Sequence, residues 1–336
     1  MLHKLNVRTG ALAAISDSAN RQIVRSRVGL VPSLVVAKRV AAVAFNLSRN
    51  ASRKRERVAH PAWKIDGGEL NVASLVTPAG ETSPIRASVC MATYNGAAYV
   101  EAQLRSILFQ LGVNDEVVIV DDASSDDTLN VVSRVNDPRI RVVRLTKNVR
   151  HVRAFERAIS EARGDYIFLS DQDDIWVDGR LDAMIHRLNS ALVVASNWTP
   201  LGEFVPPHRR FVDEDPRTHS KYSNLGSLYL GRLPYFGCAM GFRREAVDLL
   251  LPFPRATEAH DLWIAIAGNV VGQIAHMERS TVQRRIHDRN LTPTHRRPVG
   301  KIIRSRVGMG ILTITAYVRN ARENWEDASW WLKGKR

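Results

Sequence analysis

The fold is decided by the stretch Tyr166-Ile-Phe-Leu-Ser-Asp171-Gln-Asp173-Asp174-Ile-Trp176. Its apolar run has the length and residue types of a buried strand, and it stops abruptly at three carboxylates within four residues. Carboxylates crowded at the end of a buried strand repel one another, so the pattern favours a hard cation between them, with Mg²⁺ or Mn²⁺ as the candidates. The alternative is that the three carboxylates hydrate a turn and cap a following helix.

Strand patterns and helix patterns alternate before and up to this stretch. Strands are predicted at 87–92, 116–120, 140–145 and 166–169, and apolar residues at helical spacing lie between them. Four such alternations predict a mostly parallel, doubly wound α/β sheet. Beyond them, two further strands are predicted at 191–196 and 237–242.

Ligands of such sheets bind outside the carboxyl ends of the strands. This rule places three polar segments on one rim: 93–95, Asp121 with Asp122, and 171–174. Three strand ends that carry polar or acidic groups on a shared rim indicate a binding site better than any one of them alone. Later in the chain, Asp261 is predicted to lie near the N-terminus of an apolar helix and to face away from the core.

Composition limits the class of protein. With 45% hydrophobic and 24% charged residues among 336, the chain is expected to be globular with a sizeable core. Cys90 and Cys238 each lie in an apolar stretch, which is typical of buried cysteines in a reducing compartment. No uncharged apolar run reaches the roughly 20 residues of a spanning helix, so a cytoplasmic protein is expected.

The net charge of +14 is concentrated at the two ends of the chain. Residues 1–86 hold 14 Lys/Arg against 5 Asp/Glu, residues 299–336 hold 8 against 3, and the middle sums to zero. Basic ends that are rich in apolar residues suit the surface of an anionic membrane, whereas a nucleic-acid-binding core would carry its own basic face. Two alternatives remain open: a loosely ordered extension at the N-terminal end, and a C-terminal helix packed on the core.

Three motifs in order carry a resemblance to a known family. They are Val89-Cys-Met-Ala-Thr-Tyr-Asn-Gly96, Val118-Ile-Val-Asp-Asp-Ala-Ser-Ser-Asp-Asp-Thr128, and Gly164-Asp-Tyr-Ile-Phe-Leu-Ser-Asp-Gln-Asp-Asp-Ile-Trp176. Together they resemble the family 2 glycosyltransferases of the GT-A fold. Within that family, the segments 171–176 and 260–263 resemble bacterial rhamnosyltransferases of O-antigen and related surface polysaccharide synthesis.

The resemblance implies a Rossmann-like GT-A catalytic domain at 86–296, between a basic N-terminal extension and linker at 1–85 and a basic amphipathic tail at 297–336. It further implies an inverting, metal-dependent transfer of a sugar from a nucleoside diphosphate sugar, with dTDP-L-rhamnose as the favoured donor, to a glycan or lipid-linked oligosaccharide. A lipid-linked acceptor would keep the enzyme peripheral at the inner face of the cytoplasmic membrane, and no nucleic-acid partner is expected.

The resemblance also implies roles for individual residues. Asp261 is the implied catalytic base, which takes the proton of the acceptor hydroxyl. The implied nucleotide-sugar-binding residues are Thr93, Tyr94, Asn95, Asp122, Asp171 and Arg285. The implied metal ligands are Asp173, Asp171 and His287, with Asp173 in direct contact and Asp174 behind it or capping a helix. The alternative for Asp261 is a plain helix cap.

Two rival functions remain at this point. A sugar-nucleotide-forming nucleotidyltransferase would need a glycine-rich, basic loop after the first strand, and the segment 92–96 has neither feature. A catalytically silent membrane- or nucleic-acid-binding protein would act through its basic ends, and it would tolerate the loss of Asp173 or Asp261.

Overall fold

The computed structural model describes residues 84–202, 220–286 and 298–333, with the side chains of 323–333 left out. Almost all of the predicted N-terminal extension and linker, and the predicted metal ligand His287, lie outside the described residues.

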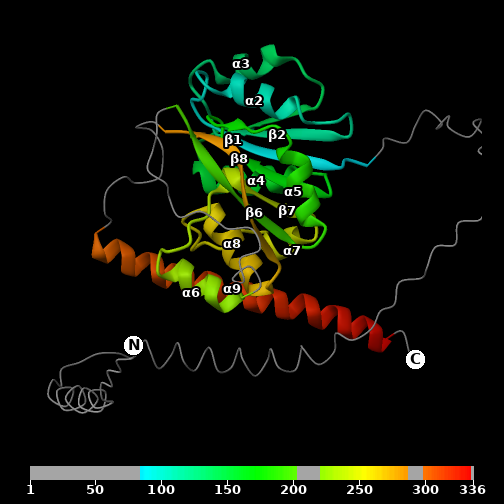
Figure 1. Cartoon of the computed structure of the whole chain (residues 1–336), viewed down its shortest axis with the longest axis vertical. Helices are drawn as coiled ribbons and strands as arrows, with labels where there is room; N and C mark the ends of the chain where they lie inside the picture. The colour runs from blue at the N-terminus through cyan, green and yellow to red at the C-terminus, as the bar shows by residue number, and fades with distance from the viewer. Residues whose placement is uncertain (1–83, 203–219, 287–297, 334–336) are drawn as a thin grey trace, which may run out of the picture. The chain divides into compact units, whose positions relative to one another are not determined.

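A sheet of eight strands runs through the described residues in the order β3-β2-β1-β4-β7-β6-β8-β5 (Figure 1). The strands are β1 (Ala87–Thr93), β2 (Asp115–Asp121), β3 (Ile140–Arg144), β4 (Tyr166–Ser170), β5 (Ile175–Trp176), β6 (Val193–Leu201), β7 (Met240–Arg243) and β8 (Ile274–Arg285). The pairs β2–β3, β1–β2, β1–β4 and β6–β8 are parallel, and β7 runs antiparallel to both of its neighbours. The predicted class, an α/β fold with a mostly parallel sheet flanked by helices, is confirmed.

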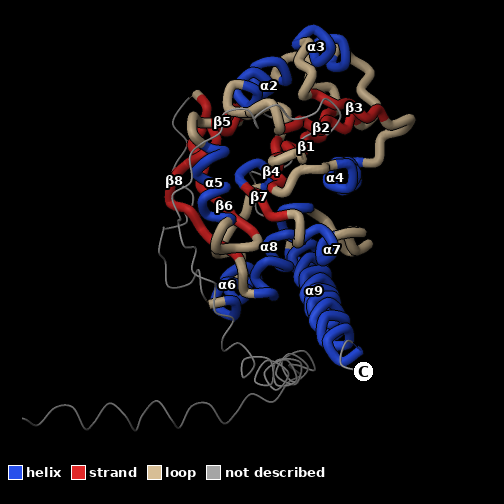
Figure 2. The backbone as a smooth tube through the Cα atoms, turned by 90° about the vertical axis from the view of Figure 1, so that its right-hand side faces the viewer, coloured by secondary structure: helices blue, strands red, loops and turns tan. Residues whose placement is uncertain are grey.

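Helices cover both faces of this sheet (Figure 2). They are α2 (Val100–Leu108), α3 (Thr128–Val135), α4 (Arg150–Glu161), α5 (Arg180–Leu188), α6 (Lys221–Tyr229), α7 (Ala246–Leu250), α8 (His260–Val271) and α9 (Val299–Lys333). Apolar residues of α2, α3 and α5 form one core with the sheet, and those of α4 and α8 form the other. Helices α6, α7 and α9 pack against α8.

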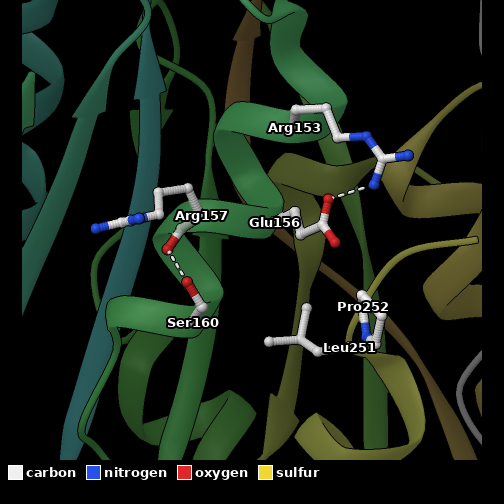
Figure 3. A pocket seen from close by; sticks show the side chains of 6 residues that line it. All are labelled: Arg153, Glu156, Arg157, Ser160, Leu251 and Pro252. Carbon is white, nitrogen blue, oxygen red and sulfur yellow. Dashed lines mark hydrogen bonds and ion pairs between the residues drawn. The ribbon is translucent and has the colours of Figure 1, made fainter. Parts of the chain in front are cut away.

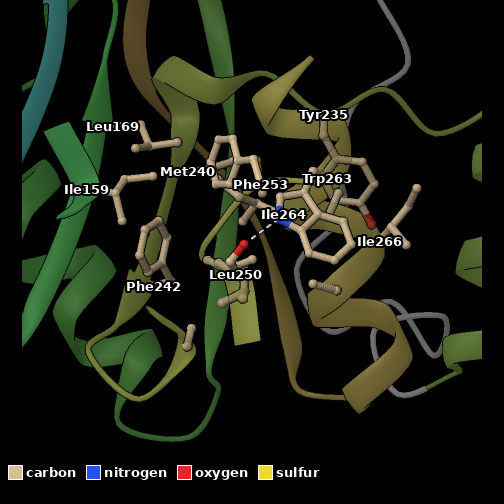
Figure 4. Packing of buried hydrophobic residues seen from close by; sticks show 14 of the residues in the cluster. Ile159, Leu169, Tyr235, Met240, Phe242, Leu250, Phe253, Trp263, Ile264 and Ile266 are labelled. Atoms are coloured by element: carbon tan, nitrogen blue, oxygen red, sulfur yellow. Dashed lines mark hydrogen bonds between the residues drawn. The ribbon is translucent and has the colours of Figure 1, made fainter. Parts of the chain in front are cut away.

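The core beneath α8 fixes the position of that helix. Trp263 and Phe242 have no exposed surface and lie in one apolar cluster (Figure 4). The indole Nε1 of Trp263 donates a hydrogen bond of 3.0 Å to the carbonyl oxygen of Leu250 at the end of α7. A large buried aromatic side chain whose polar group is satisfied anchors an element firmly, and this anchor sets the place of the N-terminus of α8.

Strand β6 and the segment after it differ from the prediction. A strand was expected to end at 196, but β6 continues to Leu201, where it pairs with Arg285 of β8. The partner strand lies far along the chain, so local periodicity carried no sign of this pairing. The strand predicted at 237–242 begins instead as a 3-10 turn, η3 (Gly237–Ala239), and only then becomes β7.

The acidic stretch does not cap a helix. Asp174 is followed by β5, and α5 begins after Gly179. The helix-capping alternative for the three carboxylates is therefore wrong, because β8 supplies a strand partner at Ile175 and Trp176 that the local sequence could not reveal.

The predicted C-terminal helix is present as α9. Met309, Leu312 and Ala316 are buried and join the core of α8, so one face of the helix packs on the preceding domain. No helix within the described ranges is long and apolar enough to cross a membrane. The division of the chain at 85 and 296 stays a prediction.

Candidate active site

Hydrogen bonds join the ends of β1 and β2. Thr93 Oγ1 donates to Asp121 Oδ1 over 3.1 Å, and the backbone N–H of Asp122 donates to the Thr93 carbonyl oxygen over 2.8 Å. Thr93, Asp121 and Asp122 are all buried. One oxygen of Asp122 also accepts the Val149 N–H at 2.6 Å, next to the N-terminus of α4. These strand ends therefore form one connected rim.

Asn95 holds the turn after β1 against the turn after β2. Its backbone lies in the left-handed region, at φ 49°, where asparagine is tolerated better than most residues. The Asn95 N–H donates to Ser124 Oγ at 3.0 Å, and its side-chain Oδ1 accepts the Ser125 N–H at 2.9 Å. The structure thus gives Asn95 a positioning contact, and its predicted contact with the nucleotide stays a prediction.

Gln172 connects the acidic stretch to the turn after β1 through two hydrogen bonds. Its Oε1 accepts the Tyr94 N–H at 2.9 Å, and its Nε2 donates to the Tyr94 carbonyl oxygen at 3.1 Å. A Cβ at Gly96 would lie 2.2 Å from Gln172 Oε1, so a larger residue there would displace the Gln172 amide. The Tyr94 residue remains 49% exposed and accessible to a stacking base.

An acidic cluster lies after β4. Asp171, Asp174 and Cys238 each present a ligand-type atom within 4.8 Å of the others. Asp174 Oδ1 accepts the Arg285 N–H at 3.0 Å, whereas its buried Oδ2 has no hydrogen-bond partner within the described part of the chain. Asp171 was a predicted metal ligand and lies in this group, Asp174 was not predicted to contact the metal directly, and the role of Asp173 as the direct ligand stays a prediction.

The electrostatics of this cluster suit a hard cation. Burial and the charges of Asp174 and Asp173 raise the pKa of Asp171 to about 8, and burial and the charge of Asp173 raise the pKa of Asp174 to about 6. A divalent cation would relieve that repulsion and would satisfy the unpartnered oxygen of Asp174. Burial also raises the pKa of the Cys238 thiol, so the neutral sulfur is a poor ligand beside two carboxylates.

Two arginines at the end of β8 border the cluster. Arg285 Nε donates to the Asp173 carbonyl oxygen at 3.2 Å, and its guanidinium lies 5.0 Å from the centre of the Tyr99 ring. The Arg284 guanidinium lies 4.9 Å from the centre of the Phe236 ring, and its charge opposes the rise in the pKa of Asp171. Both cations are placed where they could face a diphosphate.

A third arginine lies beneath the cluster. Arg180, the first residue of α5, is fully buried and donates to the Cys238 carbonyl oxygen at 2.8 Å and to Thr281 Oγ1 at 2.5 Å. Its guanidinium lies 4.5 Å from the centre of the Trp176 ring. The loss of solvent lowers the pKa of Arg180 to about 10, so the side chain stays cationic at neutral pH.

Asp261 is the second residue of α8, and its charge acts on this cluster. Its negative charge contributes to the raised pKa of Asp171. Asp261 Oδ1 accepts its neighbour Leu262 N–H at 2.7 Å, and burial raises the pKa of the carboxyl. A carboxylate with a raised pKa is a stronger base, which is the property that proton abstraction needs.

His260 belongs to the core beside Asp261. Its ring stacks on Phe155 with 4.0 Å between the ring centres, and within the described residues neither ring nitrogen has a hydrogen-bond partner. A Cβ at Gly237 would lie 2.2 Å from His260 Nε2. Burial and His151 lower the pKa of His260 to about 3, so the ring is neutral and packs like an apolar group.

A separate pocket of about 520 Å³ lies away from this rim, between α4 and the end of α7 (Figure 3). Arg153 pairs with Glu156 and Arg157 pairs with Glu161, both within α4. None of the predicted site residues lines this pocket, so the candidate site is the rim.

Sequence reasoning did not assign Gln172, Arg180, Arg284 and Cys238 to the site. Gln172 lies between Asp171 and Asp173, two predicted ligands, and this position in the sequence was a signal that it belongs to the site. The other three come from α5, β8 and η3, whose approach to the cluster depends on tertiary structure.

The region of the chain that forms the rim is similar to known proteins. The family model for glycosyl transferase family 2 matches residues 88–251, which include the turn after β1, both acidic motifs and β7. Residues 88–251 are a glycosyl transferase family 2 domain. The predicted family and its GT-A class of fold are thereby confirmed, and the predicted enzyme class is that of the family.

Curated relatives are similar over part of their length. The succinoglycan biosynthesis protein ExoO of Rhizobium meliloti is 40% identical over 30% of this chain and 29% of its own. The dTDP-rhamnosyl transferase RfbG of Shigella flexneri is 35% identical over 32% of this chain and 40% of its own. The chain thus spans less than half of either relative.

The family domain is also similar to a solved structure. S. aureus TarS in complex with UDP-GlcNAc is 19% identical over 61% of this chain and 60% of that chain, with a TM-score of 0.48.

Proposed function

We propose that the family 2 domain, together with α8 and β8, transfers a sugar from a nucleoside diphosphate sugar to a hydroxyl group, with inversion at the anomeric carbon. One observation carries this proposal: carboxylates from β2, from the end of β4 and from the start of α8 meet at one rim, next to two arginines. Binding of a diphosphate and its cation requires carboxylates and arginines close together. Deprotonation of the acceptor requires a further carboxylate that acts as the base.

Asp261 is the proposed base. Its carboxylate takes the proton of the acceptor hydroxyl while that oxygen attacks the anomeric carbon, and the bond from this carbon to the diphosphate oxygen breaks on the opposite face. The electron pair of that bond leaves with the nucleoside diphosphate. The sugar passes through an oxocarbenium-like transition state, as in glycoside hydrolysis.

The acidic cluster is proposed to hold the divalent cation. Asp171 and Asp174 have the supporting geometry, Asp173 remains the predicted direct ligand, and His287 lies outside the described residues. Mg²⁺ or Mn²⁺ bound there would neutralise the charge that grows on the leaving diphosphate. Arg285 and Arg284 are proposed to bind the phosphate oxygens, and Tyr94 to stack on the base.

The donor is proposed to be dTDP-L-rhamnose and the acceptor a glycan or a lipid-linked oligosaccharide. The likeness to a dTDP-rhamnosyl transferase supports the donor. A similar likeness to an E. coli enzyme named for glucosyl transfer from UDP-Glc, 32% identical over 32% of this chain, makes UDP-glucose the rival donor. A lipid-linked acceptor would place the enzyme at the cytoplasmic face of a membrane.

The test is thermal stability across UDP-, dTDP- and GDP-sugars, with and without Mn²⁺ or Mg²⁺. Ligands that bind the native state raise the melting temperature. We expect one nucleotide class to raise it only when metal is present, and Asp173→Ala to lose the shift. Asp178→Ala, at an exposed acid between β5 and α5, should keep it.

The outcomes are distinct. A shift with dTDP-rhamnose supports the proposed donor, and a shift with UDP-glucose alone replaces it. Absence of a shift with any sugar nucleotide at millimolar concentration, in a folded sample, would count against the transferase proposal.

A further inference from the structure

Helix α9 has two apolar faces. Met309, Leu312 and Ala316 are at most 2% exposed and lie in the core of α8. A second set of large apolar side chains is between 39% and 71% exposed: Val299, Ile302, Ile303, Val307, Ile311, Ile314 and Val318. A surface helix ordinarily carries polar residues on the face that it turns away from its domain, so this second set is unusual.

Five members of the exposed set form a stripe directly opposite the packed face. At 3.6 residues per turn, Ile303, Val307, Ile311, Ile314 and Val318 fall within about 40° of one line along the helix, and the buried residues fall on the other side. We call these five residues the outer stripe. It extends over about 22 Å of helix.

Positive charge accompanies the outer stripe. Residues 299–322 contain five Lys/Arg and no Asp or Glu. Arg304 and Arg322 are exposed and lie about 60° from the stripe around the helix. Arg319 instead donates to the carbonyl oxygens of Leu249, Leu250 and Pro252, which ties α9 to the domain. An apolar stripe flanked by exposed cations is the composition of a helix that lies in a membrane interface.

We propose that the outer stripe of α9 binds the surface of a membrane that contains anionic lipids, with the helix axis parallel to the bilayer. The apolar side chains enter the boundary between headgroups and acyl chains, while Arg304 and Arg322 meet lipid phosphates. The packed face keeps α8 on the solvent side of α9.

Charge favours lipid over two protein partners. A second copy of the chain paired in parallel would bring Arg304 and Arg322 against the same residues. The segment 21–58 of this chain, which holds ten Lys/Arg and one acid, would also set cations against them. An anionic lipid surface, in contrast, satisfies the stripe and its flanking charges together. This surface is separate from the rim, so it stands or falls independently of the transfer reaction.

A fluorescent label tests the surface at a single position. Cys90 and Cys238 are buried, so a cysteine introduced by Val307→Cys in the full chain can be labelled selectively with an environment-sensitive dye. Phe109→Cys, at a residue that is 81% exposed on the far side of the sheet, is the matched control. Vesicles of equal parts phosphatidylglycerol and phosphatidylcholine should shift the emission at 307 to the blue and leave the emission at 109 unchanged.

Two results would overturn the assignment. One is the same response at both positions. The other is no response at 307, including the case in which the dye is already shielded before vesicles are added, which would mean that another segment or copy covers the stripe.

A triple variant measures the contribution of the stripe to affinity. Val307→Gln, Ile311→Gln and Ile314→Gln together should weaken binding to the anionic vesicles roughly tenfold or more. Phe109→Gln, Val113→Gln and Leu230→Gln remove as many exposed apolar side chains elsewhere and should leave the affinity unchanged. Equal affinity of the wild type and the stripe variant would refute the proposal. So would light scattering that shows a dimeric wild type and a monomeric stripe variant, if both bind the vesicles equally. Transfer to a soluble acceptor should be the same in both variants.

Discussion

Asp261 concentrates the proposed chemistry in one carboxylate. We expect Asp261→Asn to lower kcat/KM by about 10²- to 10⁴-fold, because an amide cannot accept the acceptor proton. The raised pKa of Asp261 places the acidic limb of the wild-type pH profile above the ordinary aspartate value of 3.8. Steady-state kinetics across pH measure the loss in kcat/KM and the position of the acidic limb. Thermal shift measures donor binding. Exposed Asp248→Asn is the control, and full activity in Asp261→Asn would exclude this residue as the base.

The repulsion within the acidic cluster predicts a pH-dependent stability of the metal-free protein. The pKa values of Asp171 and Asp174 are raised, so the folded state favours their protonated forms. Their contribution to stability is fully present below about pH 4 and is lost as the pH rises through about 6 to 8. In EDTA we therefore expect the melting temperature to fall over this range.

Substitution of Asp171 separates this effect from general alkaline destabilisation. Asp171→Asn should melt above the wild type at about pH 8 and near it at or below about pH 4, and added Mn²⁺ should stabilise the wild type more than the variant. Asp178→Asn, at an exposed residue, should follow the wild type. Parallel melting curves of wild type and Asp171→Asn across pH would contradict the expectation.

Arg180 is predicted to support the cluster from below. Arg180→Met would leave the Cys238 carbonyl oxygen and the Thr281 hydroxyl without this donor, and Asp174 without a nearby buried cation. We expect a loss of about 2–4 kcal/mol in the free energy of unfolding. Arg157→Met removes an exposed ion pair on α4 and should change it by at most about 0.5 kcal/mol. Urea titration compares the two variants, and equal losses would show that Arg180 stabilises the fold no more than an exposed ion pair does.

At the scale of elements, α8 links the core to the chemistry. Trp263 and its neighbours bury the helix in the sheet, and this burial holds Asp261 at the start of α8 on the rim. The hydrogen bond from Trp263 to Leu250 ties α8 to the end of α7, which α9 also contacts through Arg319. Side chains remote from the rim therefore determine where the proposed base lies.

Helix α9 offers a comparison of adjacent residues on opposite faces. Leu312 is 1% exposed and Ile311 is 49% exposed. We expect Leu312→Ala to lower the free energy of unfolding by about 2–4 kcal/mol, because it opens a cavity against α8. Ile311→Ala should change it by at most about 0.5 kcal/mol. Denaturant titration measures both, and a negligible effect of Leu312→Ala would mean that α9 does not contribute to the fold.

At the scale of the molecule, the antiparallel strand β7 joins two parallel parts of the sheet. The β3-β2-β1-β4 part carries the turns and acids that are proposed to bind the nucleotide, and the β6-β8 part brings the arginines. The proposed site lies where these parts meet, because η3 and the end of β8 reach the acids that follow β4. The positive charge of the chain is concentrated in residues 1–86 and 299–336, and the residues between them, which include the proposed site, sum to zero.

The sequence by itself determined the alternation of strands and helices in the first half of the domain, since each apolar run there has its own period. It also determined the shared rim, because parallel strands end at the same edge. Periodicity further revealed α9, whose apolar residues recur at helical spacing.

Only the tertiary structure decided which acidic residues lie close together and which cationic residues lie near them. Asp171 and Asp174 approach each other because β8 pairs with β5 and its Arg285 N–H binds Asp174. Arg180 is buried because Cys238 and Thr281 surround it, from segments more than 50 residues away. The two faces of α9 were likewise indistinguishable in sequence, because burial depends on a partner helix and not on local periodicity.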